Sequence, residues 1–181
     1  CEYRRKGFLG RVPCDDAGTS GQAAANMFQR SSVSIRRRGH EVLVHIDHMT
    51  FVKGGASGDA NNCLIDTLRS CIDMHIPCLV NHAWIRARLC QLFPTGPNRV
   101  GPEDFLDLRA HGPAIIELVG ESARALGMDE HRRIRAQNFR VACVEERQEV
   151  LGEVVGSGPI SMYVLNEDFR HFVPLIRRRG Q

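Results

Sequence analysis

The sequence predicts an α+β fold in which N-terminal helices pack on a small, mostly antiparallel sheet. Two observations lead to this fold class. Apolar residues recur at helical spacing between residues 63 and 126, whereas short segments rich in β-branched and aromatic residues follow one another after residue 138. Helices and strands that are segregated along a chain are typical of α+β domains, whose strands pair mainly in antiparallel order.

Residues 1–40 form the first of two predicted parts, a partly ordered N-terminal arm or linker. They are rich in Gly, Ser, Ala and Arg, and only residues 21–30 favour a short helix. Residues 41–181 form the second part, the predicted domain. It opens on residues 41–51 (EVLVHIDHMTF), which alternate as a strand does, and continues into a Gly- and Asn-rich loop over residues 53–62.

Helices follow this loop, and strands follow the helices. The first helix covers residues 63–74, and the second covers residues 79–93 after the break at Pro77. Residues 105–126 hold one or two helices, with Pro113 in the first turn of the second. A short link between the last two strands indicates a hairpin. The four predicted strands are residues 139–144, 149–155, 160–165 and 171–176.

The composition indicates one packed domain from a reducing compartment. The chain has 181 residues, of which 43% are hydrophobic, and this is enough for a core. Its seven cysteines are an odd number and fall mostly in apolar segments, unlike the dense framework of a small secreted domain. No apolar run approaches the roughly 20 residues of a membrane span. We therefore expect no membrane partner.

Cys63 is the first candidate for a catalytic residue because it opens the first helix directly after a polar loop. Asn61 or Asn62 is a natural N-cap, which places Cys63 in the first helical turn. Unpaired N–H groups and the helix dipole favour negative charge there, and so favour the nucleophilic thiolate. The same N–H groups suit an oxyanion. A buried structural cysteine is the alternative interpretation.

Two sets of side chains raise the alternative of a metal site. One lies in the predicted strand and converges only if that strand bends. Its members are His45, Asp47 and His48. The other has the spacing C-x3-H-x2-C-x3-H, which matches none of the common zinc modules and contains a proline. Its members are Cys71, His75, Cys78 and His82. We therefore expect no metal and no other cofactor.

Two motifs together resemble the ovarian-tumour (OTU) family of papain-like cysteine proteases, many of which remove ubiquitin. One is NNCLI at residues 61–65, which opens a helix. The other is HFVPL at residues 171–175, which follows YVLN at residues 163–166 and opens a late strand. They are similar to the family's Asp-Gly-Asn-Cys-Leu motif and to its His-aromatic-x-x-Leu strand. The resemblance covers residues 58–176 and implies a papain-like fold.

The resemblance implies Cys–His catalysis. Cys63 is the implied nucleophile, and His171 is the implied base that accepts the thiol proton and later protonates the leaving amine. Backbone N–H groups of residues 60–63, with the side-chain amides of Asn61 or Asn62, are the expected oxyanion donors.

The third member of the expected triad departs from the family pattern. The family's acidic residue three positions before the cysteine is Ala60 here, and the Asp or Asn two positions after the histidine is Val173. Asp59 is the first choice for the residue that orients the imidazole, and Asp47 and Asn166 are the alternatives. A Cys–His dyad without a third member is a further option.

The resemblance also implies a substrate, which is ubiquitin or a ubiquitin-like protein cleaved at the (iso)peptide bond of its C-terminus. Carboxylates near the cleft would suit the arginines of the ubiquitin tail, although exposed surface positions are their simpler interpretation. The available residues are Glu103, Asp104, Asp107, Glu167 and Asp168. We expect a monomeric domain of a larger protein, such as an effector or toxin, that works in the cytoplasm, including the host cytoplasm for a secreted effector.

Other functions remain open at this point. The same Cys–His pair serves papain-like glutamine deamidases and acyltransferases. A non-catalytic protein-binding module is the other alternative. Three Arg clusters have few aromatic neighbours, so we expect no nucleic acid partner. They lie at residues 36–38, 132–133 and 177–179.

Overall fold

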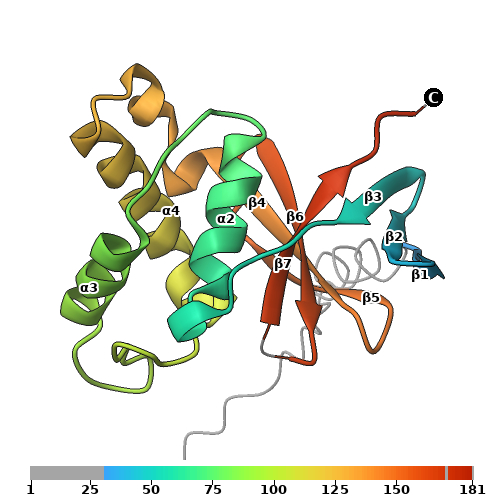
Figure 1. The fold of residues 1–181 in the computed structure, drawn as a ribbon, viewed down its shortest axis with the longest axis horizontal. Helices are drawn as coiled ribbons and strands as arrows, with labels where there is room; N and C mark the ends of the chain where they lie inside the picture. Colours follow the sequence, from blue (N-terminus) through green and yellow to red (C-terminus); the bar gives the residue numbers. More distant parts are fainter. Residues whose placement is uncertain (1–30, 170, 181) are drawn as a thin grey trace, which may run out of the picture. The chain divides into compact units, whose positions relative to one another are not determined.

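A computed structural model describes residues 31–169 and 171–180, and everything below concerns that part of the chain. Within it, three α-helices pack on a seven-stranded mixed sheet that curls like half a barrel (Figure 1). The predicted α+β class is therefore confirmed. The helix predicted over residues 21–30 lies outside the described residues.

The sheet begins with a three-stranded meander of β1 (Val33–Arg38), β2 (Glu41–Ile46) and β3 (Met49–Lys53). The single strand predicted over residues 41–51 was wrong, because the chain reverses at Asp47 and pairs Ile46 with Met49. Asp47 has a φ of 52°, a left-handed conformation that Asp tolerates in tight hairpin turns.

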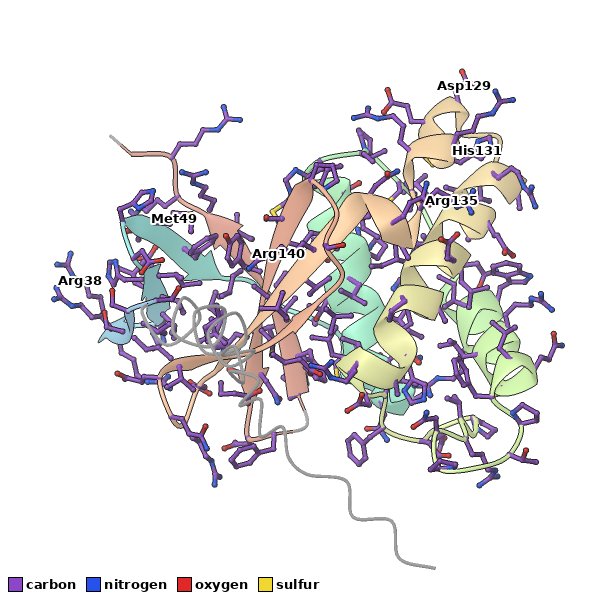
Figure 2. All side chains as sticks on the ribbon, turned by 180° about the vertical axis from the view of Figure 1, so that it is seen from behind. Arg38, Met49, Asp129, His131, Arg135 and Arg140 are labelled. Carbon is purple, nitrogen blue, oxygen red and sulfur yellow. The ribbon has the colours of Figure 1, made fainter. Side chains whose placement is uncertain are left out.

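Strand β1 pairs with β2 along its whole length, from Val33 to Arg38. It therefore belongs to the same sheet as the residues after 41, although the sequence placed residues up to 40 in the arm. Arg38 ends this edge strand, and its side chain points away from the sheet (Figure 2).

The three helices are α2 (Cys63–Asp73), α3 (His82–Leu92) and α4 (Leu108–Ala125). The third predicted region forms one helix, which begins after Asp107, whose side chain caps the Ala110 N–H at 2.7 Å. Pro113 lies inside this helix instead of in the first turn of a second one. Short 3-10 turns are η1 (Asp59–Asn61), η2 (Asp129–Arg133) and η3 (Ala136–Asn138).

Four later strands complete the sheet, which has the order β1-β2-β3-β7-β6-β4-β5. Every neighbouring pair is antiparallel except β4 and β6, which confirms the expectation of a mostly antiparallel sheet. The strands are β4 (Phe139–Glu145), β5 (Val150–Val155), β6 (Ile160–Glu167) and β7 (His171–Arg177).

Strand β7 joins the two halves of the sheet because it pairs with β3 on one side and with β6 on the other. Its side chains alternate between two cores. Phe172 packs into the larger core beneath the helices, whereas Val173 and Leu175 pack into a smaller core inside the curl. The start of β7, at Phe172, therefore lies at the boundary between the helices and the sheet.

Candidate functional site

The loop from residue 54 to residue 62 carries the chain from β3 past β7 to α2. Gly54 donates its N–H to the Pro174 carbonyl at 2.8 Å, so the loop first runs alongside β7. Four residues later, a Cβ on Gly58 would lie 4.0 Å from His171 Cε1. The loop that delivers Cys63 therefore passes against the imidazole of His171.

Cys63 is the first residue of α2, as the sequence predicts. It is buried, with 5% of its surface exposed. One turn later, the hydroxyl of Thr67 donates a 2.8 Å hydrogen bond to the Phe172 carbonyl in β7. Since Phe172 directly follows His171, this bond fixes the start of α2 beside the start of β7 and brings the two predicted catalytic residues to one corner of the fold.

Glu167 is the carboxylate that faces His171. The two residues are directly paired in the β6–β7 register, and residues paired in this way project from the same face of a sheet. Glu167 Oε2 lies 3.8 Å from His171 Nε2, which is an ion-pair contact rather than a hydrogen bond. The other carboxylate oxygen of Glu167 forms a salt bridge with Lys53 of β3. Sequence reasoning considered Glu167 as a carboxylate for the ubiquitin tail or as an ordinary surface residue, and not as a partner of His171.

The three residues predicted as candidates to orient the imidazole of a catalytic triad lie elsewhere than beside His171 in the described contacts. Asp59 is exposed in η1. Asp47 lies in the β2–β3 turn, where its carboxylate accepts from the Ser32 N–H at 3.0 Å. Asn166 donates to Glu145 at 3.1 Å, and its side chain projects from the face opposite to Glu167 because neighbouring residues of a strand alternate. None of the three has a described contact with His171.

Arg86 of α3 supports the loop before Cys63 from beneath. It is buried, with 6% of its surface exposed, and all five of its N–H groups donate hydrogen bonds. Burial lowers the pKa of Arg86, against the opposing influence of nearby groups that include Cys63. Its acceptors are Asn62 Oδ1 and the carbonyls of Ala60, Asn61, Gly101 and Asp104.

Two of these carbonyls belong to residues in the left-handed region, Ala60 with a φ of 50° and Asn61 with a φ of 56°. Such a conformation is uncommon for a residue with a side chain, and Ala has no polar group to offset its cost. Arg86 holds both carbonyls, at 3.2 and 2.9 Å. A buried guanidinium therefore stabilises the unusual backbone that turns the chain into α2.

The predicted oxyanion donors have partners of their own in this loop. The N–H groups of Asn61 and Asn62 donate to Gly58 and Asp59, and the Asn61 amide donates to the Glu103 carbonyl at 2.5 Å. The Asn62 side chain makes no capping bond. Because Arg86 only donates, the atom of the Asn62 amide that faces it is the oxygen, and the amide nitrogen is directed away from Arg86. That nitrogen is the side-chain donor that remains for an oxyanion.

Asp66 of α2 connects the loop to the helices. Its carboxylate accepts from Ser57 in the loop at 2.9 Å, from Arg69 at 3.3 Å, and bonds His82 at the start of α3 at 3.1 Å. Burial alone would raise the pKa of Asp66, but these hydrogen bonds outweigh burial and hold the pKa below its ordinary value. Asp66 is therefore ionised at neutral pH and clamps the loop.

The other helical cysteines have structural contacts. Cys71 and Cys78 donate to the carbonyls of Tyr163 and Arg69, and burial raises the pKa of their thiols to about 12 and about 11. With His82 bonded to Asp66, the C-x3-H-x2-C-x3-H set is divided among separate contacts. Across residues 31–169 and 171–180, no three His, Cys, Asp or Glu side chains are grouped as metal ligands would be.

Three of the carboxylates that were considered for a basic substrate tail have local partners. Asp104 accepts from the Gly101 N–H at 2.7 Å, Asp107 caps α4, and Asp168 forms an ion pair with Arg147 at 2.8 Å. Of the acidic residues considered, Glu167 is the one that the structure places against His171.

No protein-family model, curated protein or solved structure matches the chain. Among the helices in the described part of the chain, none is both long and apolar enough to cross a membrane.

Proposed function

We propose that the domain is a cysteine-dependent hydrolase of papain-like architecture that cleaves (iso)peptide bonds at the C-terminus of ubiquitin or a ubiquitin-like protein. One observation carries the proposal. The Thr67–Phe172 hydrogen bond fixes a helix that opens on Cys63 beside a strand that opens on His171. A thiol and an imidazole at adjacent element ends are the two parts that nucleophilic catalysis requires.

In the proposed mechanism, His171 accepts the proton of Cys63, and the thiolate attacks the carbonyl carbon of the scissile bond. Glu167, 3.8 Å from the imidazole, attracts the imidazolium that this proton transfer creates. The oxyanion receives hydrogen bonds from the start of α2 and from the Asn62 amide. His171 then protonates the leaving amine, and water releases the acyl group from Cys63 with His171 as base.

The substrate class is proposed from the OTU resemblance of residues 61–65 and 171–175. Two separate assays test the proposal. One sample of the chain reacts with a ubiquitin that carries a C-terminal electrophile, and another, unreacted sample is incubated with di-ubiquitin. We expect a covalent adduct on Cys63 that is abolished in Cys63→Ala and slowed strongly in His171→Ala. Cys90→Ala, which changes a partly buried cysteine of α3, is the matched control and should react like the natural chain.

Two results would contradict the proposal in different ways. Absence of both adduct and di-ubiquitin cleavage would exclude ubiquitin as substrate. If a general thiol electrophile also fails to modify Cys63 faster than Cys90, Cys–His catalysis itself is excluded. A gain of one dalton on a protein glutamine, without cleavage, would instead indicate a deamidase.

The burial of Cys63 favours a second candidate function, a non-catalytic protein-binding module. Only 5% of the surface of Cys63 is exposed, as for a core cysteine. This candidate requires that Cys63→Ala leaves every partner interaction and every activity unchanged. The electrophile experiment therefore separates the two candidates.

A further inference from the structure

Strands β6 and β7 pair over only part of their lengths. Their register ends at Val164 and Pro174, although β6 begins at Ile160 and β7 continues to Arg177. Beyond Pro174, β7 pairs with β3 on its other side. The start of β6 and the end of β7 therefore diverge like a fork, which Figure 1 shows opening beside the C-terminal end of α2.

The thiol of Cys71 lies at the point where the two strands part. It donates to the Tyr163 carbonyl of β6 at 3.6 Å, and it also has a hydrogen bond with the Leu175 backbone of β7. Tyr163 and Leu175 would form the next pair if the register continued. A side chain from α2 thus replaces the first missing strand–strand contact.

Past Cys71, main-chain groups of both strands face the open fork. The Tyr163 carbonyl faces it, and Ser161, two residues earlier, turns its N–H and C=O the same way. On β7, Arg178 donates its N–H to Thr50 on the β3 side, so the main-chain groups of Arg177 face the fork. The register gives neither Ser161 nor Arg177 a partner across the fork.

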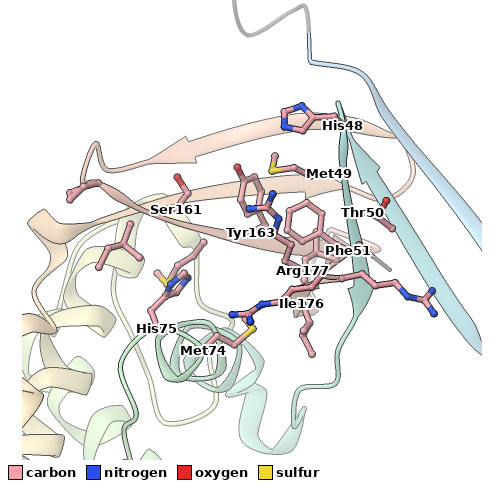
Figure 3. A pocket seen from close by; sticks show the side chains of 17 residues that line it. His48, Met49, Thr50, Phe51, Met74, His75, Ser161, Tyr163, Ile176 and Arg177 are labelled. Carbon is pink, nitrogen blue, oxygen red and sulfur yellow. The ribbon is translucent and has the colours of Figure 1, made fainter.

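The fork is lined by apolar and basic side chains and encloses about 1190 Å³ (Figure 3). Met74 and Ile176 are each 45% exposed within it, next to the Phe51 and Tyr163 rings. No Asp or Glu is among the described residues that line it. Its basic residues are His48, His75, Arg177, Arg178 and Arg179.

Arg177 and Arg179 carry positive charges that are available to a ligand. Arg178 forms an ion pair with Glu41 at 3.5 Å, but Arg177 and Arg179 have no ion pair with any residue that the structure describes. Both are exposed. The fork therefore combines strand-like main-chain donors and acceptors, an apolar floor and an uncompensated positive charge.

We propose that this fork is a docking site for an extended acidic peptide of a partner protein, which adds a strand between β6 and β7. Main-chain groups at strand spacing pair with an extended chain, and this is the contact that supplies affinity in strand addition. Alternate side chains of the peptide would meet the apolar floor, and acidic ones would meet Arg177 and Arg179.

The site is separate from the proposed catalytic corner. Cys63 begins α2, whereas Met74 and His75 follow its end, and 11 helical residues span roughly 16 Å. Binding at the fork therefore does not depend on the hydrolase proposal.

The test is a titration of the full, isotope-labelled chain with a short capped peptide that alternates Glu and Val, followed by amide NMR signals. We expect shifts centred on the amides of Ser161, Tyr163 and Arg177. The double variant Arg177→Ala/Arg179→Ala should weaken binding by about tenfold. Arg132→Ala/Arg133→Ala, which removes another exposed basic pair, is the matched control and should bind like the natural chain.

Two further peptides make the result decisive. A Lys–Val peptide should fail to bind because its positive charges are repelled by Arg177 and Arg179. An N-methylated Glu–Val peptide should fail because its backbone cannot donate hydrogen bonds to the two strands. The proposal is overturned if the Glu–Val peptide does not bind at roughly 1 mM. It is also overturned if the N-methylated peptide binds equally well, or if the shifts lie away from the fork.

Discussion

The Arg86 guanidinium lies 2.9 Å from the carbonyl oxygen of Asn61, a left-handed residue two positions before Cys63. The same guanidinium binds the Asn62 side chain, so one buried cation sets both the backbone and the amide that precede the proposed nucleophile. The geometry of the proposed catalytic corner therefore depends on a side chain that would contact no reacting atom.

Replacement of Arg86 by Lys should destabilise the loop before Cys63, although it keeps the positive charge. The ammonium group of Lys cannot reproduce the planar array of five N–H donors of the guanidinium, so several buried carbonyls lose their donors. We expect the free energy of unfolding to fall by about 2–4 kcal/mol, measured by urea unfolding. Arg88→Lys, which changes a half-buried arginine of the same helix whose side chain binds only Gln91 among the described residues, should change stability little. An equal effect of the two substitutions would contradict this role of Arg86.

Asp66 should make the stability of the domain depend on acid pH. Its folded-state pKa lies below the ordinary value of 3.8, so its stabilising effect is complete above that value and is lost as the pH falls through the folded-state pKa. Asp66→Asn should therefore lower the urea midpoint at pH 7 and have a smaller effect near pH 3. A constant difference between the two proteins at both pH values would count against the clamp.

The cysteines should differ sharply in their reactivity. Burial raises the pKa of Cys71 to about 12 and that of Cys78 to about 11, and it also raises the pKa of Cys143. Because the thiolate is the reactive form, these three should resist iodoacetamide near pH 7.5 in the folded protein. Cys63 should be modified before them, as peptide mapping by mass spectrometry would show. Earlier modification of Cys71 would refute this order.

Glu167→Gln should slow the reaction of Cys63 with the ubiquitin electrophile. The amide keeps the size of the side chain but loses the charge that attracts the imidazolium, and we expect a decrease of about tenfold in rate. Because Lys53 also binds Glu167, Lys53→Met is the necessary comparison and should have a smaller effect. Asn166→Asp and Asp59→Asn should leave the pH profile of the rate unchanged. A larger effect of Asp59→Asn than of Glu167→Gln would favour Asp59, and not Glu167, as the orienting residue.

Local features of the chain were predictable because adjacent residues determine them. The polar loop followed by apolar residues at helical spacing placed the start of α2 at Cys63, and the β-rich segment after a short link placed the start of β7 at His171. The hairpin at Asp47 was missed, since the alternation of side chains continues on both sides of the turn.

The partners of the site were not predictable because they depend on register and burial. Glu167 faces His171 only after a particular pairing of β6 with β7 has been chosen. Arg86 lies in a helix whose sequence gives no sign that this arginine is buried, while Arg88, two residues later, is only half-buried. Neither side chain differs in sequence pattern from an ordinary surface residue.

The central position of β7 also determines when this domain can fold during synthesis. While β7 is still inside the ribosome, the nascent chain already exposes one open edge on β3 and another on β6, and such edges invite pairing with other chains. Once β7 has emerged, it covers both of these edges. A premature stop codon before residue 171 should therefore yield an aggregating fragment that depends on chaperones, and not a smaller stable domain.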